Sequence, residues 1–271
     1  MATSNENVAV RGVQLLWGRV GDGLAEIGRV CELIWETIRV QVQRLPDFRL
    51  LIEQMQAIGV DSLGLVIVVS LFTGAVAAVQ AAYQFSNVVP LRYLGSVILR
   101  SVVIELGPVL TALIVGGRVG ASIAAELGTM KVTEQIDALS AMGINPVRYL
   151  VAPRVTASII MLPVVVIYAD AIAVFGGWVV ANLTLGVSTH TYVTALRQYF
   201  YMKDLASGLL KSVFFGGIIG LMGCYYGFKT EGGAEGVGKA TTGAVVSSCV
   251  LVLILDYVLA RFLFQIIFAT K

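Results

Sequence analysis

ELGTMKVTEQIDALSAMGINP (residues 126–146) is a polar interruption between two long apolar runs. The chain of 271 residues is 57% hydrophobic, and only 13% of its residues are charged. Soluble domains carry about twice that charged fraction. Runs of about 20 apolar residues follow one another, a pattern typical of membrane-spanning helices. We therefore predict an all-α integral membrane protein in which residues 126–146 form a loop between two spans.

Five apolar runs are long enough to cross a membrane. They are residues 60–82, 93–127, 155–182, 205–227 and 244–268. Pro108 is expected to kink the second run, because proline removes a helical hydrogen bond, and Pro163 lies inside the third. These runs place the transmembrane domain at residues 60–271.

The region before the first run, residues 1–59, is amphipathic rather than spanning. Between residues 10 and 44, apolar side chains recur at steps of three and four: Leu16, Val20, Leu24, Ile27, Cys31, Ile34 and Ile38. With Trp17 and Trp35, this pattern predicts a helix that lies along a membrane surface. A second short helix is expected to begin near Pro46. Its apolar side would consist of Leu51, Ile52 and Met55.

The distribution of Lys and Arg predicts the orientation of the spans. With a cytoplasmic N-terminus, eleven lie on the cytoplasmic side: Arg11, Arg19, Arg29, Arg39, Arg44, Arg49, Lys131, Arg148, Arg154, Lys229 and Lys239. Four lie on the other side: Arg92, Arg197, Lys203 and Lys271. Because cytoplasmic loops carry an excess of basic residues, residues 126–146 are predicted to be cytoplasmic and the C-terminus to be on the far side.

A short helix is predicted inside this cytoplasmic loop, over residues 134–142. Thr133 is a candidate N-cap, Gly143 suits the left-handed position that ends helices, and Pro146 prevents continuation. Ile136, Leu139 and Met142 form an apolar stripe, whereas Glu134 and Asp137 face elsewhere. Two interpretations remain open: a helix that packs against its own protein, and one that docks into a groove of a cytoplasmic partner.

Several ionisable residues lie within the apolar runs, where charge is costly and often functional. They are Arg100, Glu105, Arg118, Glu126, Asp170, Lys211, Asp256 and Arg261. We expect Arg118 and Glu126 to pair or to reach the membrane interface. Glu105, Lys211 and Asp256 come from three different runs and are predicted to meet at one cavity. They would form either a structural ion pair or a wet pocket that handles a charged head group.

Other chemistry has little support in the sequence. The chain has one histidine, His190, and three scattered cysteines, a composition that argues against a metal site. No cluster of Lys and Arg suggests nucleic-acid binding. GAEGVGKA (233–240) nearly matches a phosphate-binding loop, but Ala240 replaces the required hydroxyl residue, and a predicted span rather than a strand precedes it. We expect these glycines to form a turn and the chain to be non-catalytic, with no cofactor.

IELGPVLTALIVGGRVGASIAAELGTMKVTEQIDALSAMGINPVRYLVAPR (104–154) closely resembles the signature region of the MlaE/YrbE permease family. LLKSVFF (209–215) and LDYVL (255–259) also fit. These permeases are the membrane subunits of bacterial ABC systems that move phospholipids between membranes. The resemblance implies that the short helix is a coupling helix for an ATPase subunit, with these contact residues: Glu134, Gln135, Ile136, Asp137, Leu139 and Met142.

The resemblance also implies a lipid cavity around Glu105, Lys211 and Asp256 at the interface of a permease homodimer. Many relatives have Arg before the glutamate, where this chain has Ile104; Arg100, one turn earlier on roughly the same face, is the expected substitute. The implied partners are an MlaF-like ABC ATPase that holds ATP and Mg²⁺, an MlaD-like MCE-domain protein and, often, an MlaB-like STAS-domain subunit. The implied location is the bacterial inner membrane, with a periplasmic C-terminus.

Two alternatives to an ABC permease remain. The first is a secondary transporter driven by an ion gradient, in which Glu105, Lys211 and Asp256 form a relay and no ATPase is needed. The second is an intramembrane enzyme that acts on lipids. The single histidine and the lack of a nucleophile–base pair count against this second alternative.

Overall fold

The computed structural model describes residues 25–43, 47–85, 89–263 and 265, and the contacts divide the chain into two compact units, 1–45 and 46–271. In the first unit, residues 25–43 form one helix, as predicted for part of residues 10–44. The rest of that predicted helix lies outside the described residues. The described part of the second unit contains helices and turns but no strand, so the all-α prediction is confirmed.

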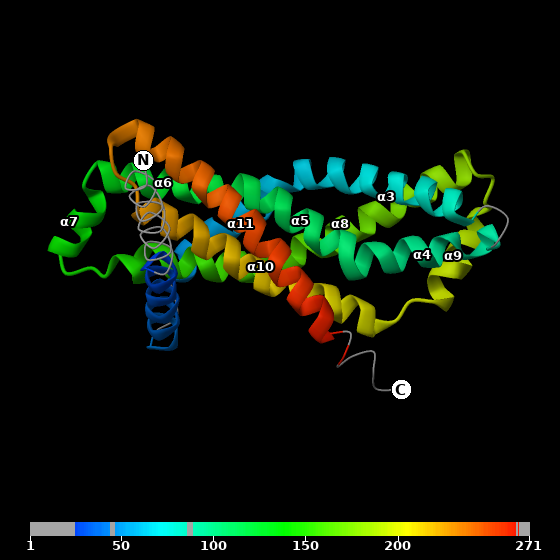
Figure 1. The fold of residues 1–271 in the computed structure, drawn as a ribbon, viewed down its shortest axis with the longest axis horizontal. Helices are drawn as coiled ribbons and strands as arrows, with labels where there is room; N and C mark the ends of the chain where they lie inside the picture. The colour runs from blue at the N-terminus through cyan, green and yellow to red at the C-terminus, as the bar shows by residue number, and fades with distance from the viewer. Residues whose placement is uncertain (1–24, 44–46, 86–88, 264, 266–271) are drawn as a thin grey trace, which may run out of the picture. The chain divides into compact units, whose positions relative to one another are not determined.

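Five helical segments of the second unit are long and apolar enough to cross a membrane, as predicted (Figure 1). We number them spans 1 to 5 in chain order: Phe48–Phe85, Leu91–Val132, Val147–Leu183, Met202–Phe228 and Gly233–Leu263. All begin before the predicted runs, and spans 1 and 5 do so by the largest margins. The glycine-rich segment 233–240 is therefore helical and not a turn, because only Gly232 and Gly233 adopt positive φ, 81° and 72°.

Span 1 consists of α2 (Phe48–Ile58), a 3₁₀ turn (Val60–Ser62) and α3 (Leu63–Phe85). A helix does begin near Pro46, as predicted: the N-cap of α2 is Asp47, whose carboxylate accepts a hydrogen bond from the Arg49 amide at 3.1 Å. Since α2 packs against a later span, it belongs to the second unit. The boundary between the compact units thus follows Leu45 rather than residue 59.

Span 2 combines α-helical and π-helical turns. Its parts are α4 (Leu94–Ser101), a π-turn (Val102–Leu106), α5 (Gly107–Val115), a second π-turn (Gly116–Gly120) and α6 (Ala121–Val132). The first π-turn precedes Pro108, the residue expected to kink this span. The Gly107 amide donates to the Val102 carbonyl, five residues back, and Pro108 has no amide hydrogen to donate. The irregularity at this proline therefore takes the form of a widened turn.

The remaining spans are more regular. Span 3 begins with a π-turn (Val147–Val151) and continues as α8 (Ala152–Leu183), which contains Pro163. Span 4 is α10 (Met202–Phe228), and span 5 is α11 (Gly233–Leu263). Two short helices connect the spans: α7 (Gln135–Ala141) before span 3, and α9 (Thr189–Gln198) after it. Figure 1 shows α7 and α9 at opposite ends of the bundle. We did not predict α9 from the sequence.

Close backbone approaches hold the bundle together. α3 packs along α8, and α10 contacts α8, α6 and α11. A methyl group added at Gly74 of α3 would collide with the Ala173 carbonyl of α8, and one at Gly176 would collide with the Leu71 carbonyl. Small residues permit this proximity, which is the usual basis of helix association in lipid.

The glycine series of α10 serves two neighbours. Gly216 and Gly220 face Ser158 and Val155 of α8. Gly223 and Gly227, further along the same helix, face Ile123 and Leu127 of α6. Helix packing is thus the role of this series, and α10 packs against both span 2 and span 3.

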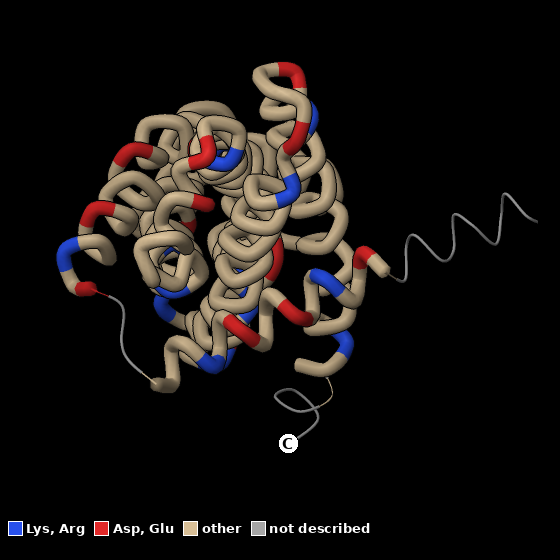
Figure 2. Tube along the Cα trace, turned by 90° about the vertical axis from the view of Figure 1, so that its left-hand side faces the viewer, with Lys and Arg blue, Asp and Glu red and all other residues tan. Residues whose placement is uncertain are grey.

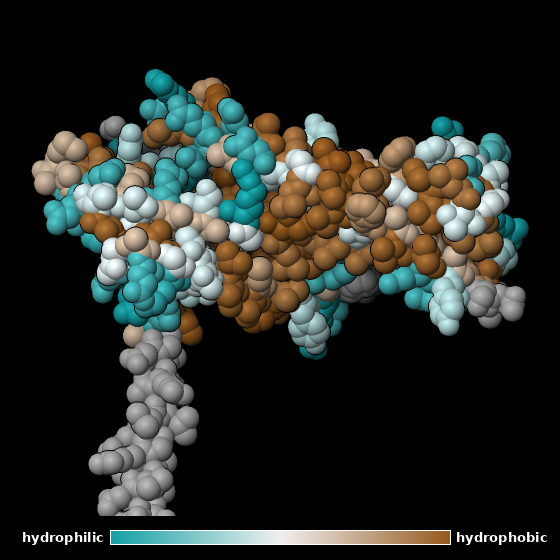
Figure 3. Space-filling model, turned by 90° about the horizontal axis from the view of Figure 1, so that it is seen from above, coloured by the Kyte–Doolittle hydropathy of each residue, from teal (hydrophilic) through white to brown (hydrophobic). Residues whose placement is uncertain are grey.

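The surface of the bundle fits a bilayer. From above, hydrophobic residues cover its middle, and more hydrophilic residues gather toward the ends (Figure 3). α11 in particular exposes large apolar side chains, including Val246, Val250, Ile254 and Tyr257. In the view down the bundle from the α7 end (Figure 2), charged residues of both signs lie on several helices and do not separate by sign.

We predict that Gly74→Ala destabilises the bundle, because its methyl group has no space beside the Ala173 carbonyl. Overpacking typically costs about 1–3 kcal/mol, and the melting temperature of the detergent-purified protein should fall by several degrees. Gly64→Ala is the matched control, since it lies in the same helix with nothing within 4 Å of the added methyl. Equal melting temperatures for the two variants would contradict the close α3–α8 contact.

Candidate functional site

Three charged side chains from three spans meet inside the bundle, as predicted. The Lys211 Nζ atom of α10 lies 2.7 Å from Glu105 Oε2 of span 2 and 2.9 Å from Asp256 Oδ1 of α11. The contact with Glu105 is a hydrogen bond donated by the ammonium group. The contact with Asp256 is an ion pair by distance, and Asp256 Oδ1 has no hydrogen-bond partner. We refer to Glu105, Lys211 and Asp256 as the charge cluster.

The charge cluster lies inside the bundle, nearer to the end that holds α9 than to the end that holds α7. At a rise of about 1.5 Å per residue, Lys211 is about 14 Å along α10 from Met202, and Asp256 is about 10 Å from Leu263. Because α11 begins as early as Gly233, Asp256 lies in its second half. Glu105 sits in the first π-turn of span 2, where the extra residue per turn changes the direction of its side chain.

Burial differs sharply within the charge cluster. The Lys211 side chain is 1% exposed and that of Asp256 is 13% exposed, whereas that of Glu105 is 43% exposed. A buried ammonium group is tolerated only if opposite charges offset its lost hydration. The cluster is therefore closed around Lys211 and open at Glu105, which is the group that a ligand can reach.

Arg100 does not join the charge cluster, contrary to our expectation. Its Nε atom donates to Asp204 Oδ2 at 3.0 Å, and its guanidinium lies 5.8 Å from the centre of the Tyr201 ring. Asp204 is buried at the beginning of α10, so it attracts the nearest cation of span 2. We had not singled out Asp204, although its position two residues from Met202 and that of Arg100 near the start of span 2 could have suggested the pair.

Asp170 of α8 is a buried carboxylate with no hydrogen-bond partner on either oxygen. It is 6% exposed and faces Gly107, where an added methyl group would collide with its carboxylate. Gly107 directly follows the π-turn that carries Glu105. Asp170 thus packs against the backbone of span 2 at the level of the charge cluster but takes no part in it.

Two further ion pairs stabilise the end of the bundle that holds α7. Glu126 Oε1 of α6 lies 2.6 Å from Arg154 Nη2 of α8, and Arg154 is buried. Arg118 Nη1 donates to Ser62 Oγ at 2.8 Å, and its Nη2 lies 3.9 Å from Asp61 Oδ2. Both pairs connect different spans, in agreement with the structural role expected for Arg118 and Glu126.

The short helix α7 exists, but its N-cap was predicted incorrectly. Thr133 ends α6, and its hydroxyl donates to the Thr129 carbonyl. Glu134 occupies the cap position with φ of 61°, and its side chain makes no capping bond. Among the described residues it is the one non-glycine residue with positive φ, a conformation that costs about 1–2 kcal/mol. It allows α7 to follow α6 with almost no linker. Gly143 has φ of 77°, as predicted.

The apolar stripe of α7 is only partly available to a partner. Ile136 is 4% exposed and is buried within this chain, and Leu139 is half-buried. Met142 is 66% exposed. Asp137 pairs with Lys131 of α6 at 2.9 Å, so this carboxylate fixes α7 to its own chain. Met142, Glu134, Gln135 and the Lys131-paired Asp137 are the predicted contact residues that are exposed to solvent.

No group of His, Cys, Asp or Glu residues in the described ranges has a metal-binding arrangement. The charge cluster itself combines one basic group with two acidic groups in apolar surroundings. It can bind or orient a charged group, and the described residues around it bring neither histidine nor cysteine to that position. Binding is thus the chemistry that its geometry supports.

Comparisons with known proteins identify the family. The sequence model described as permease MlaE matches residues 51–262. A probable ABC transporter permease protein of Rickettsia typhi is 46% identical over 217 residues, which are 80% of this chain and 84% of the relative. A Synechocystis protein with the same description is 37% identical over 79% of this chain and 81% of its own length. The Arabidopsis thaliana protein named trigalactosyldiacylglycerol 1, chloroplastic, is 36% identical over 79% of this chain and 61% of its own length.

We predict that Lys211→Met lowers the stability of the protein more than Lys211→Met combined with Asp256→Asn. Lys211→Met alone leaves two carboxylates without their counter-charge, and removal of one partner from a buried pair costs about 3–5 kcal/mol. The exposure of Glu105 should keep the loss near the lower end. Lys203→Met is the control, because Lys203 is exposed in the same helix. Melting temperatures measured in nanodiscs rank the stabilities of these variants. A Lys211→Met protein as stable as wild type would contradict the prediction.

Proposed function

The chain belongs to the MlaE permease family, and we propose that it is the membrane subunit of an ABC transporter that moves phospholipids between membranes. Two copies would form the transport pathway. A separate MlaF-like chain would bind ATP and Mg²⁺ and hydrolyse the ATP. An MlaD-like MCE-domain protein would contact the far side, and an MlaB-like STAS-domain subunit would complete the system.

The charge cluster is the observation that carries the lipid proposal. A phospholipid combines a charged head group with long apolar chains, and a suitable site must offer both environments. Lys211 holds Glu105 and Asp256 among apolar spans, and Glu105 is exposed enough to meet a head group. The diacylglycerol in the name of the Arabidopsis relative also favours a glycerolipid as the substrate class.

The position of α7 supports the proposed coupling to an ATPase. It follows α6 after Thr133 and Glu134, and the Lys131–Asp137 pair stabilises this junction. A force on α7 would therefore reach α6 directly. α6 belongs to span 2, the same span that carries Glu105, so ATP-driven motion could tilt spans 2 and 3 and reshape the cavity between two copies.

The two π-turns of span 2 are the positions at which this helix could bend during such a motion. Both lie between α7 and the beginning of span 2, and Glu105 is within the farther one. π-turns have weaker and wider hydrogen bonding than α-helix and often mark functional positions. We propose that α6 moves as a rigid lever and that the π-turns absorb part of its displacement.

ATP rather than an ion gradient is the favoured energy source, because relatives from Rickettsia and Synechocystis are described as ABC transporter permeases. The proposed location is a bacterial inner membrane with the N-terminus in the cytoplasm. The excess of Lys and Arg on the α7 side supports this orientation. The end of the bundle that holds α9 would then face the periplasm, together with the C-terminus.

We predict that Glu105→Leu reduces the phospholipid that co-purifies with the protein. Loss of one charge-assisted hydrogen bond should weaken retention about tenfold. Glu53→Leu is the control, because Glu53 is an exposed carboxylate of α2 that pairs with Arg49 in the same helix. Quantitative mass spectrometry of extracted lipids gives the ratio of lipid to protein. Undiminished phospholipid in Glu105→Leu would refute a head-group role for the charge cluster.

We predict that Met142→Glu prevents stable association with the ATPase without unfolding the permease. Met142 is 66% exposed beside α7, and a carboxylate there would have to be desolvated in an apolar groove. Met202→Glu is the matched control, since Met202 is 69% exposed at the opposite end of the bundle. Co-purification and ATPase turnover are the measurements. Normal assembly and turnover of Met142→Glu would exclude docking through this residue.

A further inference from the structure

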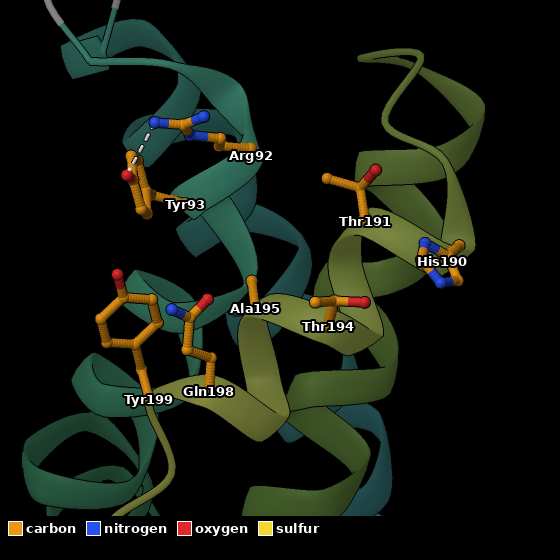
Figure 4. Close-up of a pocket in the computed structure, with 8 residues that line it drawn as sticks. All are labelled: Arg92, Tyr93, His190, Thr191, Thr194, Ala195, Gln198 and Tyr199. Carbon is orange, nitrogen blue, oxygen red and sulfur yellow. Dashed lines mark hydrogen bonds between the residues drawn. The ribbon is translucent and has the colours of Figure 1, made fainter.

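A polar pocket of about 380 Å³ lies at the end of the bundle that holds α9, away from the charge cluster. One wall is the 3₁₀ turn Leu91–Tyr93 before span 2, and the other is α9. In Figure 4, Arg92 and Tyr93 face Thr194 and Gln198 across the cavity, and the Tyr199 ring closes its lower side. None of the functions considered above uses this pocket.

The chemistry of the pocket favours an anion. Arg92 supplies a permanent positive charge, and no carboxylate is among the eight described residues that line it. The Arg92 Nη2 atom donates to the Tyr93 hydroxyl at 2.9 Å, which fixes the guanidinium but uses only one of its five N–H groups. The remaining N–H groups, the Thr194 hydroxyl and the Gln198 amide can all donate to the oxygens of a phosphate.

The walls of the pocket are held in place before any ligand binds. Tyr192 of α9 is 1% exposed and donates to the Val174 carbonyl of α8 at 3.0 Å. Burial raises the pKa of the Tyr192 phenol, so this group stays protonated and keeps its donor. The Tyr93 ring of the opposite wall meets the ring of Tyr199, the residue after α9, edge to face, with centroids 6.1 Å apart. A prearranged site loses little free energy to ordering when it binds.

The surroundings of the pocket favour a lipid over a free ion. It lies where spans 1 and 3 end and span 2 begins, at the level where tyrosine side chains gather in membrane proteins. Leu91 and Phe200, each next in the chain to a lining residue, are 41% and 44% exposed. Acyl chains could cover such exposed apolar side chains while the phosphate occupies the polar cavity.

We propose that this pocket is a second lipid site, which binds the phosphate of an anionic glycerophospholipid at the membrane interface. The site is separate from the charge cluster, and the inference rests on the pocket itself rather than on the proposed transport function. Arg92 is its principal phosphate ligand. Thr194 and Gln198 add hydrogen bonds, and the Tyr93–Tyr199 pair forms its apolar side.

The experiment uses the full-length protein in a neutral detergent and titrates it with short-chain phosphatidylglycerol, counting bound lipids by native mass spectrometry. Diacylglycerol with the same chains is the uncharged comparison. We expect Arg92→Gln to weaken one phosphatidylglycerol site about tenfold, the effect of losing a charged hydrogen-bond donor, and to leave diacylglycerol binding unchanged. Gln198→Ala should weaken the same site by a smaller factor.

Arg197→Gln is the matched control, because Arg197 is an exposed residue of α9 that does not line the pocket. It removes the same charge from the same end of the protein. Equal weakening by Arg92→Gln and Arg197→Gln would show a diffuse charge effect and overturn the proposal. Full displacement of the lipid by an equal concentration of inorganic phosphate would also overturn it, in favour of a free-anion site. Retained binding in Glu105→Leu would separate this site from the charge cluster.

Discussion

The constraint on which this structure depends is that a charge in a bilayer has no water to solvate it. Lys211 is the clearest case, since its ammonium group is fully enclosed and must find its counter-charges within the bundle. Those counter-charges come from spans 2 and 5, so α10 has to lie between them. The Arg100–Asp204 and Glu126–Arg154 pairs follow the same rule at other levels, because each joins two different spans. Apolar packing alone would not specify these neighbours, since lipid tails are as apolar as the helices.

Span 2 connects the two regions that a transporter of this kind must coordinate. Its beginning lines the polar pocket beside α9, its first π-turn contributes Glu105, and its last helix leads directly into α7. The spans around it are held by backbone contacts that leave no space for a methyl group, as at Gly74 and Gly176. The packed helices around span 2 thus form a rigid frame, and the π-turns of span 2 are the positions at which we propose that movement occurs.

Much of the fold could be predicted from sequence, because hydrophobic runs report membrane spans directly. The number and order of the spans were correct, and so was the meeting of Glu105, Lys211 and Asp256, which follows from the cost of leaving any of them unpaired. The start of α11 was missed because Gly236 and Gly238 indicated a turn, whereas both lie within the helix without positive φ. Arg100 was misassigned because helix periodicity gives the face of a residue but not the partner nearest to it. The partner nearest to Arg100 is Asp204 and not the charge cluster.

Local geometry was harder to predict than span order. Thr133 has the right side chain for an N-cap, but its hydroxyl bonds back to α6, and Glu134 takes a left-handed conformation that no sequence rule favours for glutamate. α9 was missed because its polar segment lies outside the apolar runs and its N-cap, Ser188, was not recognised as a helix start. Its pocket could not be anticipated either, since Arg92 and Gln198 are about a hundred residues apart.

The π-turn at Val102–Leu106 also has an evolutionary meaning. A π-turn is equivalent to one residue inserted into a continuous α-helix, and the wider turn absorbs that residue, so that only side chains within the turn change direction. A lineage can therefore reorient a functional side chain by gaining or losing a single codon, while both flanking helices keep their packing. Relatives that differ by one residue before Gly107 would present a different side chain where this protein presents Glu105. A one-residue gap in this segment would then record a change in what the pathway recognises, rather than a neutral difference in length.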